Sequence, residues 1–232
     1  MSSQLRLSEL FTSIQGEGSL VGMPSVFIRL SGCNLRCIWC DTPYASWDPE
    51  GPNLSVEAIT EQALATGVRH AVITGGEPML FAGTEILCQN LAAHGLHLTI
   101  ETAGTIFREL PCDLMSISPK LSHSDPVGND WLERHRRTRS DLAPLRDLVR
   151  HYEFQLKFVV RGTEIERDLD EIDTILAQLG DVPSSRVVLM PEGVERDTLT
   201  ESLKALVPVA MGRGYRLSPR MHVDLFGNTK GT

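Results

Sequence analysis

Short apolar runs alternate with longer amphipathic stretches along most of this 232-residue chain. Eight apolar runs have the length and composition that predict β-strands: Gln4–Ile14, Ser25–Leu30, Ala71–Thr74, His97–Glu101, Leu114–Ser118, Phe154–Val160, Arg186–Met190 and Arg216–Ser218. Four amphipathic stretches predict helices: Ser55–Ala65, Thr84–His94, Arg167–Leu179 and Asp197–Val209. Strands that alternate with helices predict a parallel sheet with right-handed crossovers.

Local signals mark the ends of three of these helices. Ser55 is of the residue type that caps a helix N-terminus, and Val56, Ile59 and Ala63 would then share one face. Gly95 and Gly180 follow the next two helices, where a glycine stops a helix by taking a left-handed conformation.

The number of strand–helix units limits the choice of fold. A closed α/β barrel needs eight units and about 250 residues. The chain offers about six units, so we expect an α/β fold in the form of a partial (open) parallel β/α barrel of about six strands. The charged and Pro/Gly-containing stretch His123–Leu142 breaks the rhythm, and we interpret it as an insertion in a single domain over residues 1–232.

Charge and hydropathy exclude some functions. The chain has 22 Lys plus Arg against 30 Asp plus Glu, and a net charge of -8 argues against broad binding of nucleic-acid phosphates. We interpret the basic run Arg134–Arg139 as a solvated face. No apolar window approaches the roughly 18 residues of a membrane span, and residues 1–15 lack a signal-peptide pattern, so we expect neither membrane insertion nor export.

The cysteines carry the strongest chemical signal. Cys33, Cys37 and Cys40 form a C-x3-C-x2-C pattern directly after the strand Ser25–Leu30, where the active sites of α/β barrels collect. Three thiolates are one short of a closed zinc site or a simple electron-transfer cluster. The pattern instead favours a [4Fe–4S] cluster with one open iron, although zinc with a distant histidine remains an alternative.

Two further cysteines, Cys88 and Cys112, lie far apart among apolar neighbours. They are too few to hold a second cluster, and an odd total of five cysteines fits a disulfide framework poorly. We therefore expect both to be core residues in a protein of the reducing cytoplasm.

A second motif, Thr74-Gly-Gly-Glu-Pro78, ends the next strand. Two glycines allow a ligand to approach the backbone, and the carboxylate of Glu77 can accept hydrogen bonds from an ammonium group. Alone the motif is typical of a turn, but its place beside the cysteine loop favours a binding function.

Together these two motifs resemble the radical S-adenosylmethionine superfamily. Within it, the chain resembles the 7-carboxy-7-deazaguanine synthases. The matching segments are Gln15-Gly-Glu-Gly18, Phe27-Ile-Arg-Leu30, Cys40-Asp-Thr42, Ser118-Pro-Lys120, Gln155-Leu-Lys-Phe158, Met190-Pro-Glu-Gly193, Ser218-Pro-Arg-Met-His222 and Leu225-Phe-Gly-Asn228. The resemblance therefore spans nearly the whole chain.

The resemblance implies a lyase that converts 6-carboxy-5,6,7,8-tetrahydropterin to 7-carboxy-7-deazaguanine with release of ammonia, on the pathway to queuosine and related deazapurines. It implies that S-adenosylmethionine binds the open iron, and that a 5′-deoxyadenosyl radical takes hydrogen from the carbon that bears the carboxylate. The cofactor is then re-formed. It also implies Mg²⁺, an electron donor such as flavodoxin or ferredoxin, and a homodimer.

The same resemblance assigns residues to three groups. It implies substrate contacts from Ile14, Gln15, Gly16, Glu17, Arg29, Thr74 and His222. It implies S-adenosylmethionine contacts from Trp39, Cys40, Asp41, Gly76, Glu77, Ser118, Pro119, Lys120, Gln155, Lys157, Phe158, Met190, Pro191, Glu192 and Gly193. It implies cluster ligation by Cys33, Cys37 and Cys40, and magnesium binding by Thr42. Because the chain ends in Asn228-Thr-Lys-Gly-Thr232 and not in proline, we carry over no contact from a terminal carboxylate.

Each assignment has a simpler alternative. Arg29 would otherwise be a strand arginine paired with an acid, Thr42 the start of a Thr-Pro turn, and His222 an ordinary strand histidine. Two other functions share the cysteine pattern: an activase that installs a glycyl radical on a partner, and an iron–sulfur electron carrier. Activases often carry extra cluster ligands that two spare cysteines cannot supply, and a carrier needs no open iron.

Overall fold

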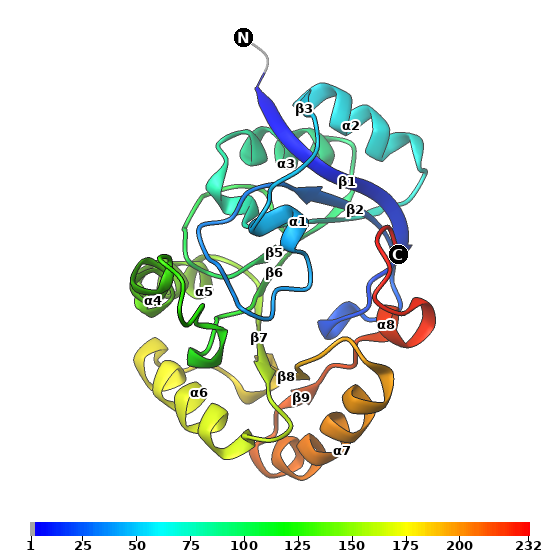
Figure 1. Ribbon diagram of the computed structural model, residues 1–232. Coiled ribbons are helices and arrows are strands. Elements are labelled where there is room, and N and C mark those ends of the chain that lie inside the picture. The colour runs from blue at the N-terminus through cyan, green and yellow to red at the C-terminus, as the bar shows by residue number, and fades with distance from the viewer. Residues whose placement is uncertain (1–2) are drawn as a thin grey trace.

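The computed structural model describes residues 3–232, and one open sheet of nine strands runs through it (Figure 1). The strand order is β3-β1-β2-β4-β5-β6-β7-β8-β9. The strands are β1 (Gln4–Ile14), β2 (Pro24–Leu30), β3 (Asn53–Ser55), β4 (His70–Gly75), β5 (His97–Thr102), β6 (Leu114–Ile117), β7 (Phe154–Val160), β8 (Val187–Pro191) and β9 (Arg216–Leu217). Neighbours from β2 to β9 are parallel, whereas β1 is antiparallel to both β2 and β3. The predicted open parallel barrel is confirmed.

Helices surround this sheet on its outer side, as Figure 1 shows for α2, α3, α5, α6 and α7. The eight helices of the described chain are α1 (Pro43–Ser46), α2 (Val56–Ala65), α3 (Gly83–Ala93), α4 (Leu132–Ser140), α5 (Ala143–His151), α6 (Ile165–Leu179), α7 (Arg196–Arg213) and α8 (Met221–Phe226). No helix within residues 3–232 combines the length and the apolar character needed to cross a bilayer.

The eight predicted strands and four predicted helices are present, with ends that differ by at most a few residues. Ser55 caps α2 as expected, since its Oγ accepts a hydrogen bond from the backbone N–H of Ala58 at 3.1 Å. The antiparallel placement of β1 was not predicted, because a strand's partner depends on distant segments. The stretch His123–Leu142 contains α4, whose polar sequence has no apolar periodicity to reveal it.

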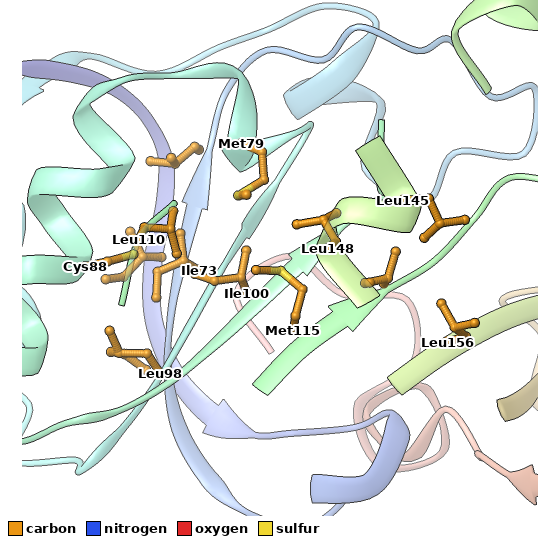
Figure 2. Close-up of a cluster of buried hydrophobic side chains, with 14 of the residues drawn as sticks. Ile73, Met79, Cys88, Leu98, Ile100, Leu110, Met115, Leu145, Leu148 and Leu156 are labelled. Atoms are coloured by element: carbon orange, nitrogen blue, oxygen red, sulfur yellow. The ribbon is translucent and has the colours of Figure 1, made fainter. Parts of the chain in front are cut away.

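The main core lies between the sheet and the outer helices (Figure 2). Side chains alternate between the two faces of a strand, so Ile73 of β4 and Ile100 of β5 point outward while their neighbours point into the barrel. These two residues are paired in register, and Ile100 pairs with Met115 of β6. Leu148 of α5 covers this outer face.

Cys88 and Cys112 lie at this core and outside the cysteine loop. Cys88 is fully buried on α3, and Cys112 is partly buried against the same cluster. Burial raises the pKa of the Cys112 thiol to about 12 and raises that of Cys88 as well, so both stay protonated. The expectation that Cys88 is a core residue is confirmed, and Cys112 borders the core.

A chain of buried hydrogen bonds joins the amino-terminal parts of β2, β4 and β5. The hydroxyl of Ser25 donates to the carbonyl of Met23 at 2.8 Å and therefore accepts from His70 Nδ1 at 2.7 Å. His70 Nε2 is then free of a proton and accepts from the hydroxyl of Thr99 at 2.8 Å. This arrangement holds a neutral imidazole, and burial lowers the pKa of His70 to about 4.

His70 should make the free energy of unfolding depend on pH. The folded-state pKa of about 4 lies below the value of 6.5 for a free histidine. The stabilisation is therefore complete above pH 6.5 and is lost as the pH falls from 6.5 towards 4. We expect a smaller loss of stability between pH 7 and pH 5 in His70→Gln than in the unchanged protein, measured by urea unfolding. His94→Gln, at an exposed position, is the control. Equal pH dependence in His70→Gln and the unchanged protein would contradict the assignment.

Candidate active site

A cavity of about 740 Å³ opens at the carboxyl ends of the parallel strands. Loops that follow β2, β4, β5, β6 and β8 line it, together with the N-terminal loop and the chain from Arg220 onward. Chemistry collects at this end of α/β barrels, because every strand delivers a loop there. The cavity is therefore the candidate site.

The cysteine loop, residues Ser31–Thr42, forms one wall of this cavity. Its start is fixed by backbone hydrogen bonds from Gly32 N to Ala45 O at 2.7 Å and from Glu77 N to Gly32 O at 2.9 Å. The second bond joins the loop to the Gly-Gly-Glu-Pro turn. A Cβ at Gly76 would lie only 2.1 Å from Gly32 O, so this approach requires glycine at position 76.

All three cysteines of the loop line the cavity as free thiols. Burial raises the pKa of Cys33 and of Cys37 to about 12, so iron would have to displace their protons on binding. Ser46 Oγ lies 3.1 Å from Cys40 Sγ, which supplies a polar neighbour for a liganding sulfur. Within residues 3–232, no three His, Cys, Asp or Glu side chains come together closely enough to hold a single metal ion.

These observations fit a cluster better than a zinc ion. The thiolates of an iron–sulfur cluster bind different irons and so stand further apart than the ligands of a single ion. Three soft sulfur donors on one short loop are also the ligand type that such clusters take. In addition, the indole N–H of Trp39 beside Cys40 is buried without a hydrogen-bond partner in the described chain, as expected if a ligand completes the wall.

The Glu77 side chain lies behind the turn and does not reach the cavity. Its carboxylate is fully buried and accepts from Thr102 Oγ1 at 2.8 and 2.9 Å, from Ala103 N at 2.9 Å and from Met79 N at 3.0 Å. Burial raises the pKa of Glu77 despite these bonds. The structure therefore differs from the expectation that Glu77 accepts from a cofactor ammonium group: it holds the turn, and Gly76 faces the cavity.

A chain of charged side chains also lines the cavity and ends on the cysteine loop. Glu17 accepts from Lys157 Nζ at 2.5 Å and from Arg220 Nε at 3.0 Å. Burial alone would raise the pKa of Glu17, but the positive charges of Lys157 and Arg220 outweigh it and hold that pKa well below its usual range. Arg220 extends the chain to Asp41 of the cysteine loop and to the carbonyl of Gly193.

Glu101, at the end of β5, projects into the cavity beside this chain of charges. It accepts from Gln15 Nε2 at 3.1 Å and from Thr74 Oγ1 at 3.0 Å, and Lys157 Nζ lies 3.7 Å away. Glu101 and Arg220 were both missed in the sequence analysis. Arg220 could have been found because it lies inside a quoted motif, Ser218–His222. Glu101 could have been found because it ends a predicted strand, next to Thr74 of the neighbouring strand.

Arg29 leaves part of its guanidinium free. Its Nε donates to Glu9 Oε2 at 2.7 Å, and Tyr44 OH donates to the same oxygen at 2.9 Å. No hydrogen bond or ion pair within residues 3–232 engages the two terminal nitrogens of Arg29, whose side chain is 16% exposed and lines the cavity. The pairing with an acid that was expected as the simpler alternative is present, but it fixes the side chain without occupying its outer edge.

His222 lies on α8 and not on a strand, which corrects the simpler interpretation of this residue. The backbone N–H of Met221 donates to Gly16 O at 3.0 Å, and a Cβ at Gly16 would lie 2.1 Å from His222 Nδ1. Glycine at position 16 therefore lets the C-terminal helix close over the N-terminal loop. Burial lowers the pKa of His222, which favours the neutral imidazole.

Most residues expected at the site line the cavity. All seven expected substrate contacts do so, as do Thr42 and the three cysteines. Among the expected cofactor contacts, the lining residues are Trp39, Cys40, Asp41, Gly76, Ser118, Lys120, Lys157, Met190, Pro191, Glu192 and Gly193. Thr42 Oγ1 lies 3.8 Å from Cys40 Sγ, directly before α1.

Besides Glu77, three of the expected contacts lie outside the lining: Pro119, Gln155 and Phe158. Phe158 is fully buried because it points to the opposite face of β7 from Lys157 and Val159. Gln155 holds the N-terminal loop instead, since its Oε1 accepts from Ser19 N at 2.9 Å and its Nε2 donates to Ser116 Oγ at 2.8 Å.

The last five residues, Asn228–Thr232, also line the cavity. Lys230 pairs with Glu50 and lies over the ring of Tyr44 at 4.3 Å. The end of the chain, for which the sequence analysis expected no contact, therefore reaches the cavity.

Comparison with known proteins gives one consistent result. The model of the radical SAM superfamily matches residues 27–152. The 7-carboxy-7-deazaguanine synthase of Rhodopirellula baltica is 44% identical over 99% of this chain and 90% of its own length. That of Halobacterium salinarum is 43% identical over 98% and 93%. The crystal structure of QueE from Escherichia coli is similar with a TM-score of 0.67 at 27% identity and covers 93% of each chain.

The buried pair of Glu17 and Lys157 should be essential for stability. Lys157→Met would leave Glu17 with only Arg220 as a close cation, so we expect the free energy of unfolding to fall by about 3 kcal/mol. Lys204→Met removes an exposed pair with Glu201 and should cost under about 0.5 kcal/mol. Urea unfolding measures both. Adding Glu17→Gln to Lys157→Met should recover part of the loss, whereas equal effects of Lys157→Met and Lys204→Met would contradict the coupling.

Proposed function

The chain belongs to the radical SAM superfamily and, within it, to the 7-carboxy-7-deazaguanine synthases, and on this basis we propose how its residues divide between cluster, cofactor and substrate. It is a radical SAM lyase that uses a [4Fe–4S] cluster and S-adenosylmethionine. Its reaction converts 6-carboxy-5,6,7,8-tetrahydropterin to 7-carboxy-7-deazaguanine with release of ammonia.

One observation carries the assignment of residues. Three thiols of the cysteine loop and a set of charged side chains line a single cavity. Its volume of about 740 Å³ lies within the roughly 300–1,000 Å³ that is typical of small-molecule sites. Cluster, cofactor and substrate would therefore share one cavity, as a reaction between bound cofactor and bound substrate demands.

We place the cluster on Cys33, Cys37 and Cys40 and the cofactor beside it. When bound, the cluster and S-adenosylmethionine supply one-electron cleavage of the cofactor and the hydrogen-abstracting group. The backbone at Gly76 would present acceptors to the cofactor amino group, in the role first expected for the Glu77 carboxylate. Trp39 would lie against the cofactor. Lys120 Nζ lies 5.6 Å from the centre of the Trp39 ring.

The substrate would lie against the charged wall. The free edge of the Arg29 guanidinium suits a bidentate contact with the substrate carboxylate. Glu101 suits the other end of the pterin, because a carboxylate can accept from the neighbouring ring N–H and amino groups of an aminopyrimidinone. Gln15 and Thr74 orient that carboxylate, which explains why both lie at the substrate wall. The neutral imidazole of His222 would cover the ring.

Thr42, next to Cys40 and Asp41, would hold Mg²⁺, which would supply Lewis-acid stabilisation of negative charge on the substrate. Hard oxygen ligands and bound water suit this ion. Thr42 lines the cavity, and within residues 3–232 the side-chain partner of its Oγ1 is Cys40 Sγ at 3.8 Å.

We propose further that residues 1–232 act as a single domain, which the continuous sheet from β3 to β9 supports. Free thiols that must ligate iron favour the reducing cytoplasm. The cluster needs an electron donor, for which flavodoxin or ferredoxin is the expected type. A homodimer is the family expectation, and sedimentation measurements can test it.

The two alternative functions have less support. A glycyl-radical activase or an iron–sulfur electron carrier would share the cysteine loop. Neither would need the cavity to continue from that loop to Arg29 and Glu101, where a carboxylated small molecule fits.

Removal of Cys37 tests the catalytic assignment. After anaerobic reconstitution and reduction, the unchanged protein should convert the carboxypterin to 7-carboxy-7-deazaguanine in the presence of S-adenosylmethionine. Cys37→Ala should retain no intact cluster and form no product, measured by iron content and chromatography. Cys88→Ala, in the core, should retain the cluster and form the product. A fully loaded protein that forms no deazaguanine would refute the function.

Arg29→Lys tests the substrate assignment. Lysine keeps the charge but loses the paired donors, so we expect KM for the carboxypterin to rise about tenfold or more. Iron content and binding of S-adenosylmethionine should not change. Arg6→Lys, at an exposed position of β1 outside the cavity lining, should leave KM as it is. An unchanged KM in Arg29→Lys would show that another group binds the carboxylate.

A further inference from the structure

The segment Leu121–Ser140 packs directly on the cysteine loop. It comprises a short turn of 3₁₀-helix (Ser122–Ser124), a connection and helix α4, and we call it the clamp segment. It overlaps the stretch His123–Leu142, which the sequence analysis interprets as an insertion. In Figure 1, α4 lies beside the loop that crosses the front of the barrel.

Hydrogen bonds from the clamp segment hold the cysteine loop on both sides of Cys37. The backbone N–H of Arg36 donates to His135 Nδ1 at 3.0 Å. The backbone N–H of Ile38 donates to the carbonyl of Ser124 at 3.0 Å. The carbonyl of Cys37 itself accepts from Trp47 Nε1 at 3.0 Å. Three hydrogen bonds therefore hold the backbone of residues 36–38, and the clamp segment accepts two of them.

Ring contacts extend the same interface. The guanidinium of Arg36 lies 4.1 Å from the centre of the Trp131 ring, and that of Arg134 lies 4.4 Å from the same ring. Trp39 stacks on His123 with ring centres 5.4 Å apart. Arg36, Ile38 and Trp39 therefore all contact the clamp segment, and Cys37 lies between them.

His135 is the centre of this arrangement. Its side chain is fully buried on α4. Because Nδ1 accepts from a backbone N–H, the proton of the neutral ring lies on Nε2, which donates to Ser124 Oγ at 3.0 Å. The Ser124 hydroxyl in turn donates to Leu121 O at 2.7 Å. One imidazole thus joins the start of the clamp segment, its helix and the cysteine loop.

The clamp segment is itself anchored to the barrel. Asp125 accepts from Arg136 Nε at 2.6 Å and from Arg139 Nε at 2.8 Å. Glu171 of α6 accepts from Ser122 N at 2.9 Å and from Arg139 Nη1 at 3.1 Å. The segment can therefore hold the loop against a fixed support.

We propose that the clamp segment sets the cysteine loop in its cluster-binding conformation, and that His135 is a positioning residue for the Cys37 thiolate. The proposal rests on the cluster assignment made above and extends it to residues that touch neither cluster nor substrate. Partners that orient a ligand without touching the metal typically change metal affinity 10–100-fold.

Three variants test this role. His135→Leu removes the acceptor at a similar side-chain volume. His135→Asn restores an acceptor oxygen near the position of Nδ1. Arg137→Leu changes an exposed residue of the same helix and is the control. The reconstituted holoprotein is mixed anaerobically with an iron chelator, and cluster loss is followed by its absorbance. In the cluster-free chain, hydrogen exchange of the amides of residues 36–38 is measured by mass spectrometry.

We expect His135→Leu to lose its cluster about tenfold faster and to exchange these amides faster, with His135→Asn near the unchanged protein in both. Unchanged rates in His135→Leu would overturn the proposal, as would equal defects in His135→Leu and His135→Asn. Neither readout requires product. If the variants show this pattern but the unchanged protein forms no deazaguanine, the proposed reaction is refuted and the proposal for the clamp segment stands.

Discussion

The ionic chain Lys157–Glu17–Arg220–Asp41, whose first three members are largely buried, holds the site together. It joins the N-terminal loop, strand β7, the C-terminal segment and the cysteine loop, four parts of the sequence that share no local structure. Glu17, Lys157 and Arg220 lose hydration on burial, and close pairing offsets that loss, whereas the Asp41 side chain at the end of the chain is 38% exposed. Lys157 is 6% exposed and Arg220 7%, so neither has water as a substitute partner. The cavity keeps its shape because these four segments cannot separate without leaving a charge unpaired.

This constraint gives the cavity two chemically different ends. Sulfur donors collect on the cysteine loop, where the clamp segment fixes the backbone around Cys37. Carboxylates and cations collect on the far wall, where Glu101 and Arg29 retain free hydrogen-bonding capacity towards the cavity. Asp41 belongs to both ends, since it follows the last cysteine and pairs with Arg220. The Arg220–Asp41 ion pair therefore joins the cysteine loop directly to the charged residues of the same cavity.

The sequence predicted what local patterns determine. Strand and helix periods, the Ser55 cap and the cysteine loop at the end of β2 all depend on neighbouring residues, and all were found. The antiparallel pairing of β1 and the role of α4 depend on distant partners, and they were missed. Phe158 was expected at the cavity because its motif also contains Lys157. Successive residues of a strand lie on opposite faces, so Lys157 lines the cavity and Phe158 lies in the core. Arg220 and Glu101 lie within a quoted motif and at a predicted strand end, but their partners at residues 17, 41, 74 and 193 come together only in the fold.

The central claim is that cofactor and substrate meet in this one cavity. Carboxypterin carrying deuterium on the carbon that bears the carboxylate can be turned over with unlabelled S-adenosylmethionine, and the recovered cofactor analysed by mass spectrometry. The account predicts deuterium in the re-formed S-adenosylmethionine, in proportion to turnover. Product formation with no deuterium in the recovered cofactor would contradict it.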